Sequence, residues 1–91
     1  MSDSQPEMRL TDLDVDQILG FIIGITSSKA LQYLGINIDG STTDVDLKKA
    51  NVMIDCTSYL VEKVTPVIDE AEAKNLKNMV SDLQLRYVKL S

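Results

Sequence analysis

Residues 17–28 read QILGFIIGITSS, and this stretch decides how the 91-residue chain folds. It contains no charged residue, and Lys29 is the only charged residue between Asp16 and Asp39. On a helix its large apolar side chains point to every side, and they are Ile18, Leu19, Phe21, Ile22, Ile23 and Ile25. A helix that is apolar all round must be covered all round, which two neighbours in one short chain cannot do well. We therefore expect a buried first helix that is covered partly by other chains.

Small residues follow one side of this helix. Gly20 and Gly24 form a G-x-x-x-G pair, and Ser27 or Ser28 continues the stripe about one turn further on. Small residues let two helix backbones approach closely, whereas a glycine inside a helix costs up to about 1 kcal/mol relative to alanine. The pattern predicts a helix-packing interface made by Gly20, Phe21, Ile23, Gly24, Ser27 and Ser28. In the alternative interpretation, each glycine only makes room for a bulky side chain from another helix of the same chain.

A membrane-spanning role for the first helix is the weaker interpretation. A transmembrane helix needs about 20 apolar residues, and the uncharged run is roughly half that length and ends in Thr26, Ser27 and Ser28. We therefore expect no membrane partner.

The ends of three helices can be located from capping residues. Asp14 and Gln17 have the spacing of a capping box, as do Asp69 and Glu72. Gly35 is suited to close the first helix in the left-handed conformation. Pro66 excludes the helical conformation from the residue before it. With apolar spacings of three, four and seven residues, these signals predict an all-α fold with helices at about 14–34, 46–64 and 70–89.

The length fits one domain, which we place at 14–91 behind a flexible acidic tail at 1–13. A chain of this size has a small core and is marginally stable unless something supplements it. One cysteine cannot form an intramolecular disulfide, and the chain has no histidine, the commonest transition-metal ligand. Partner surface is the remaining supplement, so we predict a homo-oligomer, a dimer or larger, assembled as a helical bundle.

The net charge of −5 is unevenly distributed. Residues 1–46 carry eight acids and two bases, and residues 47–91 carry six acids and seven bases. A chain without a basic cluster lacks the face that neutralises phosphates, so nucleic acid is not an expected partner. The start of the chain has neither the basic nor the apolar region of a secretory signal, and with a lone cysteine this favours the cytoplasm.

No catalytic, cofactor-binding or metal-binding constellation can be assembled from the sequence. Cys56 lacks a histidine to act as its base, and we expect it to be a structural cysteine on a buried or half-buried helix face. Asp39 and Gly40 resemble a fragment of a calcium loop but stand in the wrong register, which favours an ordinary acidic turn. Thr26 and Ser27, like Ser28, are expected to hydrogen-bond back to the preceding helical turn.

One acidic residue interrupts the apolar stretch of the second helix. Asp55 is either a solvated helix residue or one partner in a polar contact between helices, within or between chains. Lys63, Arg86 and the hydroxyl of Tyr87 are the candidate partners. A pair of this kind would fix orientation more than it would add stability.

Several segments together carry a resemblance to a known family, namely Val45-Asp46-Leu47, Ala50, Ile54-Asp55, Leu60, Lys63-Val64-Thr65, Asp69-Glu70 and residues 82–88 (DLQLRYV). Over about residues 14–89 the chain resembles the domain of unknown function family 1844, a group of short helical proteins of bacteria and archaea. The chain departs from the family pattern at Pro66-Val67-Ile68, where a Gly-Asn-Leu turn is usual, and at Gln84, where a basic residue is usual. The resemblance implies three helices and supplies no reaction.

These observations favour a non-enzymatic interaction or accessory subunit that acts through helix packing. A small helical protein that binds an apolar ligand between the first helix and its neighbours is the alternative. An enzyme built across a subunit interface is a further hypothesis, with Asp55, Tyr59, Lys63, Arg86 and Tyr87 as its residues.

Overall fold

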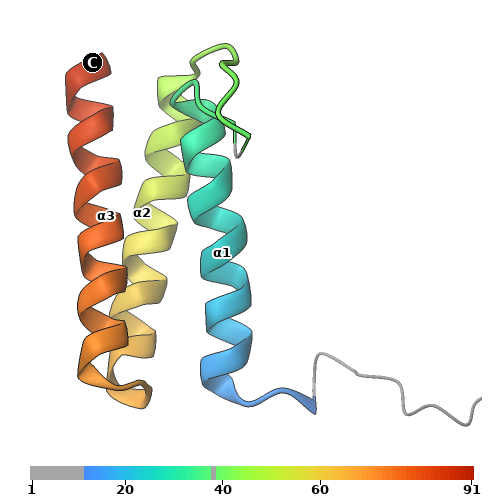
Figure 1. Cartoon of the computed structure of the whole chain (residues 1–91), viewed down its shortest axis with the longest axis vertical. Coiled ribbons are helices and arrows are strands. Elements are labelled where there is room, and N and C mark those ends of the chain that lie inside the picture. Colours follow the sequence, from blue (N-terminus) through green and yellow to red (C-terminus); the bar gives the residue numbers. More distant parts are fainter. Residues whose placement is uncertain (1–11, 38) are drawn as a thin grey trace, which may run out of the picture.

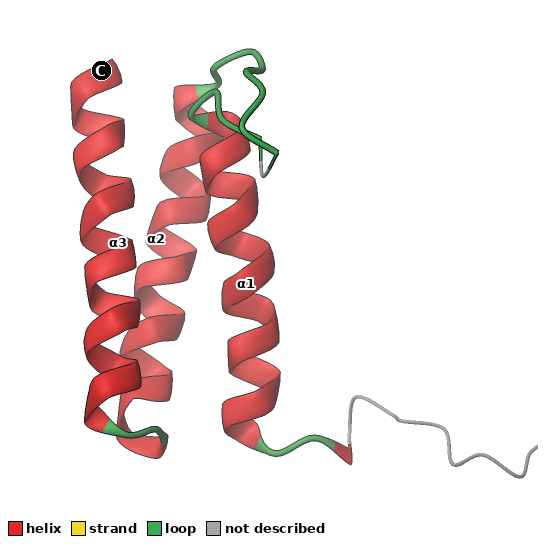
Figure 2. Ribbon diagram, in the orientation of Figure 1, coloured by secondary structure: helices red, strands yellow, loops and turns green. Residues whose placement is uncertain are grey.

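Three helices make up the fold. The computed structural model describes residues 12–37 and 39–91, and in them lie α1 (Val15–Tyr33), α2 (Leu47–Val64) and α3 (Glu70–Leu90). Figure 1 shows α2 beside both of the other helices, with successive helices running in opposite directions. Figure 2 shows the loops confined to the helix ends. The all-α prediction is confirmed for these residues, whereas most of the predicted tail falls on residues 1–11 and lies outside them.

An aspartate side chain caps the start of each of the three helices, as predicted for Asp14 and Asp69. Both hydrogen bonds of the capping box are present at α1, where the backbone N–H of Asp14 donates to Gln17 Oε1 at 2.9 Å. Asp46 Oδ1 accepts from the N–H of Lys49 at 3.1 Å, and Asp69 Oδ1 accepts from the N–H of Glu72 at 2.8 Å. Each cap satisfies amide groups that have no partner inside the helix.

Backbone constraints end the first two helices near the predicted positions. Gly35 follows α1 with a φ of 99°, a left-handed conformation that glycine adopts without steric cost. After Val64 the chain continues as a short 3₁₀ turn, η2 (Thr65–Val67), which contains Pro66. The turn and Asp69 reverse the chain direction between α2 and α3.

Two clusters of buried apolar residues form the core. One lies toward the end of α1 and consists of Ala30, Leu34, Ala50, Ile54 and Leu83. The other lies toward the start of α1 and consists of Ile23, Val61, Val64 and Val80. Each cluster contains residues of all three helices, and the first also contains Leu34, the residue after α1. Within the bundle, α1 packs mainly against α2 and only slightly against α3.

A pair of threonines lies where α1 crosses α2. Thr57 is 0% exposed, and its Oγ1 lies 2.7 Å from the carbonyl oxygen of Met53 and 2.8 Å from Thr26 Oγ1. Thr26 Oγ1 also lies 3.2 Å from the carbonyl oxygen of Ile23. The two hydroxyl groups have one hydrogen each, so two of these three contacts can be hydrogen bonds at one time, and each hydroxyl always has a partner to which it can donate. The pair fixes how α1 and α2 are aligned along their axes.

We predict that Thr57→Val lowers the free energy of unfolding by about 1–2 kcal/mol, because it keeps the shape of the side chain and removes its buried hydrogen bonds. Urea denaturation followed by circular dichroism measures the change. Asn51→Ala, at an exposed position of α2, is the control and should differ from wild type by less than about 0.5 kcal/mol. Equal stability of Thr57→Val and wild type would contradict a structural role for the threonine pair.

Candidate interaction surface

The side of α1 that faces away from α2 exposes large apolar side chains. Phe21 is 58% exposed, Ile25 is 49% exposed, and Val15 and Ile22 are also exposed. We call this surface, with Gly20 and Gly24, the outer face of α1. It carries no charged residue from Gln17 to Ser28. Large exposed apolar patches on soluble proteins mark sites of interaction.

The two glycines of this face have no packing role within the described chain. A Cβ atom added to Gly20 or Gly24 would meet nothing within 4 Å. No side chain of α2 or α3 in residues 12–37 and 39–91 therefore occupies the space beside them. The alternative in which each glycine makes room for a neighbouring helix of the same chain has no support in these residues.

A shallow hollow follows the glycines along the helix surface. It is lined only by residues of α1, namely Gly20, Phe21, Gly24, Ile25, Ser28 and Lys29. Phe21 and Ile25 form part of its wall and are also exposed to solvent. One helix face thus presents both a depression and bulky side chains of a size to fill one.

The residues predicted to form the interface divide between two sides of α1. Gly20, Phe21 and Gly24 are exposed, and Ser28 is half-buried. Ile23 is 2% exposed and Ser27 is also buried, because both face the core of their own chain. Only the first four are available to another molecule. The expected back-bonding is present at Thr26, as described above, and at Ser27, whose hydroxyl donates to the carbonyl oxygen of Gly24 at 3.2 Å.

The four predicted polar-contact residues are not brought together within the chain. Arg86 forms an ion pair with Asp82 at 2.8 Å, one turn earlier on α3. Lys63 Nζ lies 5.3 Å from the centre of the Tyr59 ring. Asp55 is exposed, and Tyr87 packs against the core cluster that contains Leu83. Contacts between chains remain a prediction for Asp55.

Cys56 is exposed, so the expectation of a buried or half-buried cysteine is wrong. The buried stripe of α2 consists of Ala50, Ile54, Thr57, Val61 and Val64. Cys56 stands two residues after Ile54, which turns it by about 200° and away from the core.

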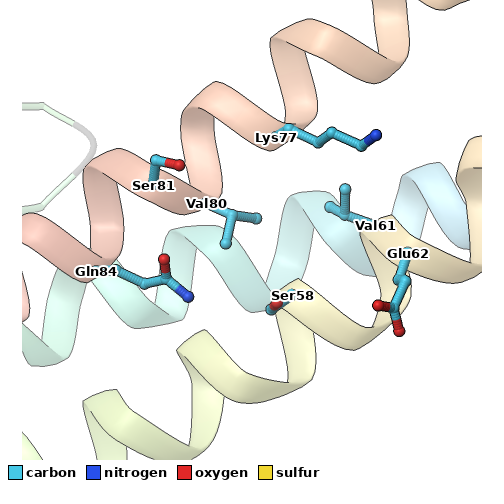
Figure 3. Close-up of a pocket in the computed structure, with 7 residues that line it drawn as sticks. All are labelled: Ser58, Val61, Glu62, Lys77, Val80, Ser81 and Gln84. Carbon is cyan, nitrogen blue, oxygen red and sulfur yellow. The ribbon is translucent and has the colours of Figure 1, made fainter.

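A polar groove between α2 and α3 was not anticipated from the sequence. Its floor contains Val61 and Val80, and its polar lining is Ser58, Glu62, Lys77, Ser81 and Gln84, as Figure 3 shows. These polar residues flank buried apolar positions of α2 and α3. The sequence shows this pattern on each helix, but the groove can be deduced from it only when α2 is known to pack against α3. The ion pair between Arg86 and Asp82 is the only one found in the described part of the chain, so Glu62 and Lys77 are not paired with each other.

The comparison with known families agrees with the resemblance noted above. The profile of the domain of unknown function DUF1844 matches residues 17–89. The chain belongs to this family. The matched residues include nearly all of α1, with the outer face from Gln17 onward, as well as α2 and α3. No match was found among curated proteins or among solved structures.

Two further properties of this DUF1844 member concern membranes and metals. None of the helices in the described residues combines the length and the apolar character needed to cross a membrane. Within the same residues, no three or more acidic, cysteine or histidine side chains are grouped as metal ligands would be.

The loop between α1 and α2 forms a turn around Asp39. Asp39 Oδ1 accepts hydrogen bonds from the hydroxyl of Ser41 at 2.7 Å and from the backbone N–H of Ser41 at 3.0 Å. These bonds stabilise the carboxylate and lower the pKa of Asp39, the hydroxyl having the larger effect. The carboxylate is thus engaged by its own loop, in agreement with an ordinary acidic turn.

We predict that Ser41→Ala raises the pKa of Asp39 toward the usual value of about 3.9, because the hydroxyl donor is lost while the backbone donor remains. Since the folded pKa is the lower one, the turn gains stability above the unfolded pKa and loses it as the pH falls through the folded pKa. Carboxyl carbon shifts recorded by NMR during acid titration measure this. Thr42→Ala is the control, and an unchanged pKa in Ser41→Ala would contradict the assignment.

Proposed function

We propose that this DUF1844 protein is a non-enzymatic interaction or accessory subunit of the cytoplasm. It acts through helix packing, without a cofactor, and assembles with copies of itself through the outer face of α1. The observation that carries the proposal is the pair of helical glycines with empty space beside them, next to Phe21 and Ile25 at 58% and 49% exposure.

The energetics of α1 support a partner. Fully burying a side chain such as Phe or Ile gains about 1.5–3 kcal/mol, and the outer face holds several that the chain leaves half-exposed. Each glycine also costs up to about 1 kcal/mol in helix propensity relative to alanine, and no contact within the described residues offsets this cost. A partner on this face would bury the exposed apolar side chains, and close contact with it would explain why the glycines are there. The polar residues around the face would then form the rim that interfaces usually have.

The form of the hollow bears on the alternative of a small apolar ligand. The hollow lies on the outer surface of α1 and is lined by that helix alone, rather than between α1 and its neighbours. Ligand sites usually enclose about 70–90% of the surface of a drug-sized ligand, and a single helix face covers only one side. A second helix suits such a surface better. A ligand retained through purification and detected by native mass spectrometry would instead favour the alternative.

We predict that Gly20→Leu and Gly24→Leu abolish the assembly and leave the chain folded. A Cβ atom at either position would meet nothing within 4 Å, and leucine is the better helix former by up to about 1 kcal/mol. The added side chains would, however, separate the two backbones at the interface. Light scattering over a wide concentration range gives the mass, and thermal melts followed by circular dichroism report the fold.

The matched control is Asn75→Leu, which adds the same side chain at an exposed position of α3 and should keep the wild-type mass. Wild-type protein that stays monomeric at every concentration would contradict self-assembly. Glycine variants that keep the wild-type mass would place the contact elsewhere on the molecule.

A further inference from the structure

We infer that two copies of the chain pair through α1 in antiparallel orientation, with Phe21 of each copy seated in the hollow beside Gly24 of the other. This inference rests on the proposed self-assembly and adds its geometry. The second copy then supplies the side chain that fills the site, and the two contacts are related by a two-fold axis, as in most homodimers.

The pairing follows from the order of residues along the outer face. Positions 17, 21, 24 and 28 are spaced by four, three and four residues, so they lie on one side of the helix. Gln17, Phe21 and Gly24 are exposed and Ser28 is half-buried. Along the helix, the line therefore runs from a polar side chain (Gln17) to a large apolar one (Phe21), then to a glycine without a side chain (Gly24) and to a second polar side chain (Ser28).

Antiparallel packing matches these positions by size. If Phe21 lies opposite Gly24 of the other copy, then Gly24 lies opposite Phe21 of that copy. Each ring then enters the other copy's hollow beside a glycine where a Cβ atom would meet nothing within 4 Å. Facing positions that alternate large with small interdigitate well. Parallel packing would set Phe21 against Phe21 and Gly24 against Gly24, which crowds one level and leaves a gap at the other.

The same alignment matches polar groups at both ends of the contact. It sets Gln17 opposite Ser28 of the other copy. Gln17 Oε1 already accepts the N–H of Asp14, so its amide NH₂ group is the part that can donate, and the hydroxyl oxygen of Ser28 can accept. Polar groups at the edge of an apolar contact are thereby paired rather than left unsatisfied.

The distribution of charge also favours a second copy in the antiparallel orientation. Asp12 and Asp14 precede α1, Asp16 lies in its first turn, and all three are exposed. Lys29 lies toward the end of α1, where it is half-buried and its Nζ donates to Gln32 Oε1 at 3.1 Å. Antiparallel packing brings the acidic start of each helix beside the end that carries Lys29, and it opposes the two helix dipoles. Parallel packing would bring the three carboxylates of each copy together. The two ends of α1 are thus complementary in charge, and the outer face between them is complementary to itself in shape.

Disulfide trapping tests the orientation in the full chain. Cys56 is exposed, so every variant carries Cys56→Ser. One chain carries Gln17→Cys and the other Ser28→Cys, and the two are oxidised separately and as an equal mixture. Positions 17 and 28 lie about 16 Å apart along one helix, whereas a disulfide needs Cα atoms within about 7 Å. We expect the mixed disulfide to exceed either symmetric disulfide by about ten-fold.

A second measurement leaves Gln17 and its capping role intact. Full-length chain that carries only Cys56→Ser is labelled with ¹⁵N. It is mixed with unlabelled chain that carries Cys56→Ser and a nitroxide attached at Ser28→Cys. Antiparallel pairing predicts broadening of the amides near Gln17, and parallel pairing predicts broadening near Ser28.

The outcomes separate this inference from the proposed function. Symmetric disulfides at both positions, or broadening centred on Ser28, would overturn the antiparallel arrangement while self-assembly stands. A dimer in which no combination of cysteines at positions 17 and 28 cross-links faster than Asn75→Cys on α3 would also overturn the antiparallel arrangement, because the contact would lie away from α1. Wild-type protein that is monomeric by light scattering would overturn the inference and the proposed function together.

Discussion

The rest of the structure depends on the fact that α1 is covered by its own chain on one side only. Ile23, Ala30 and Leu34 are almost fully buried toward α2 and α3, while Phe21 and Ile25 on the opposite side are about half exposed. In residues 12–37 and 39–91, no side chain of α2 or α3 lies within 4 Å of a Cβ atom added to either glycine. A small core of two clusters thus coexists with an apolar surface on the same helix. This division separates what holds the chain together from what is left for a partner.

The helix ends could be predicted from the sequence because each depends on a local interaction. Asp14 with Gln17, Asp46 and Asp69 need only neighbouring backbone amides to act as caps, and Gly35 needs only its own conformational freedom. The boundaries 14–34, 46–64 and 70–89 therefore agree with the observed helices to within one residue at each end. Membership of the DUF1844 family was likewise recognisable from the sequence, where the resemblance covers about residues 14–89 and the family profile matches residues 17–89.

The side of α1 that faces the core could not be predicted in the same way. A helix that is apolar all round has no hydrophobic stripe from which its orientation can be deduced, so Ile23 and Ser27 were grouped with Gly20 and Gly24 although they point into the chain. Cys56 is exposed for a different reason: Tyr59 and Leu60, which lie three and four residues later on the same side of α2, are apolar but are themselves exposed and half-buried. The groove between α2 and α3 depends on which helices meet, and this is set by tertiary packing such as the buried cluster that contains Val61 of α2 and Val80 of α3.

Phe21 offers a direct view of the outer face, because it is the only phenylalanine in the chain. Uniform incorporation of 4-fluorophenylalanine places one ¹⁹F nucleus on this face, and its shift difference between H₂O and D₂O reports contact with water. If a second copy covers α1, the shift difference should be small at high concentration and should grow on dilution, in step with the fall in mass. A fluorine that stays fully accessible to water at every concentration would contradict the claim that another copy covers this face.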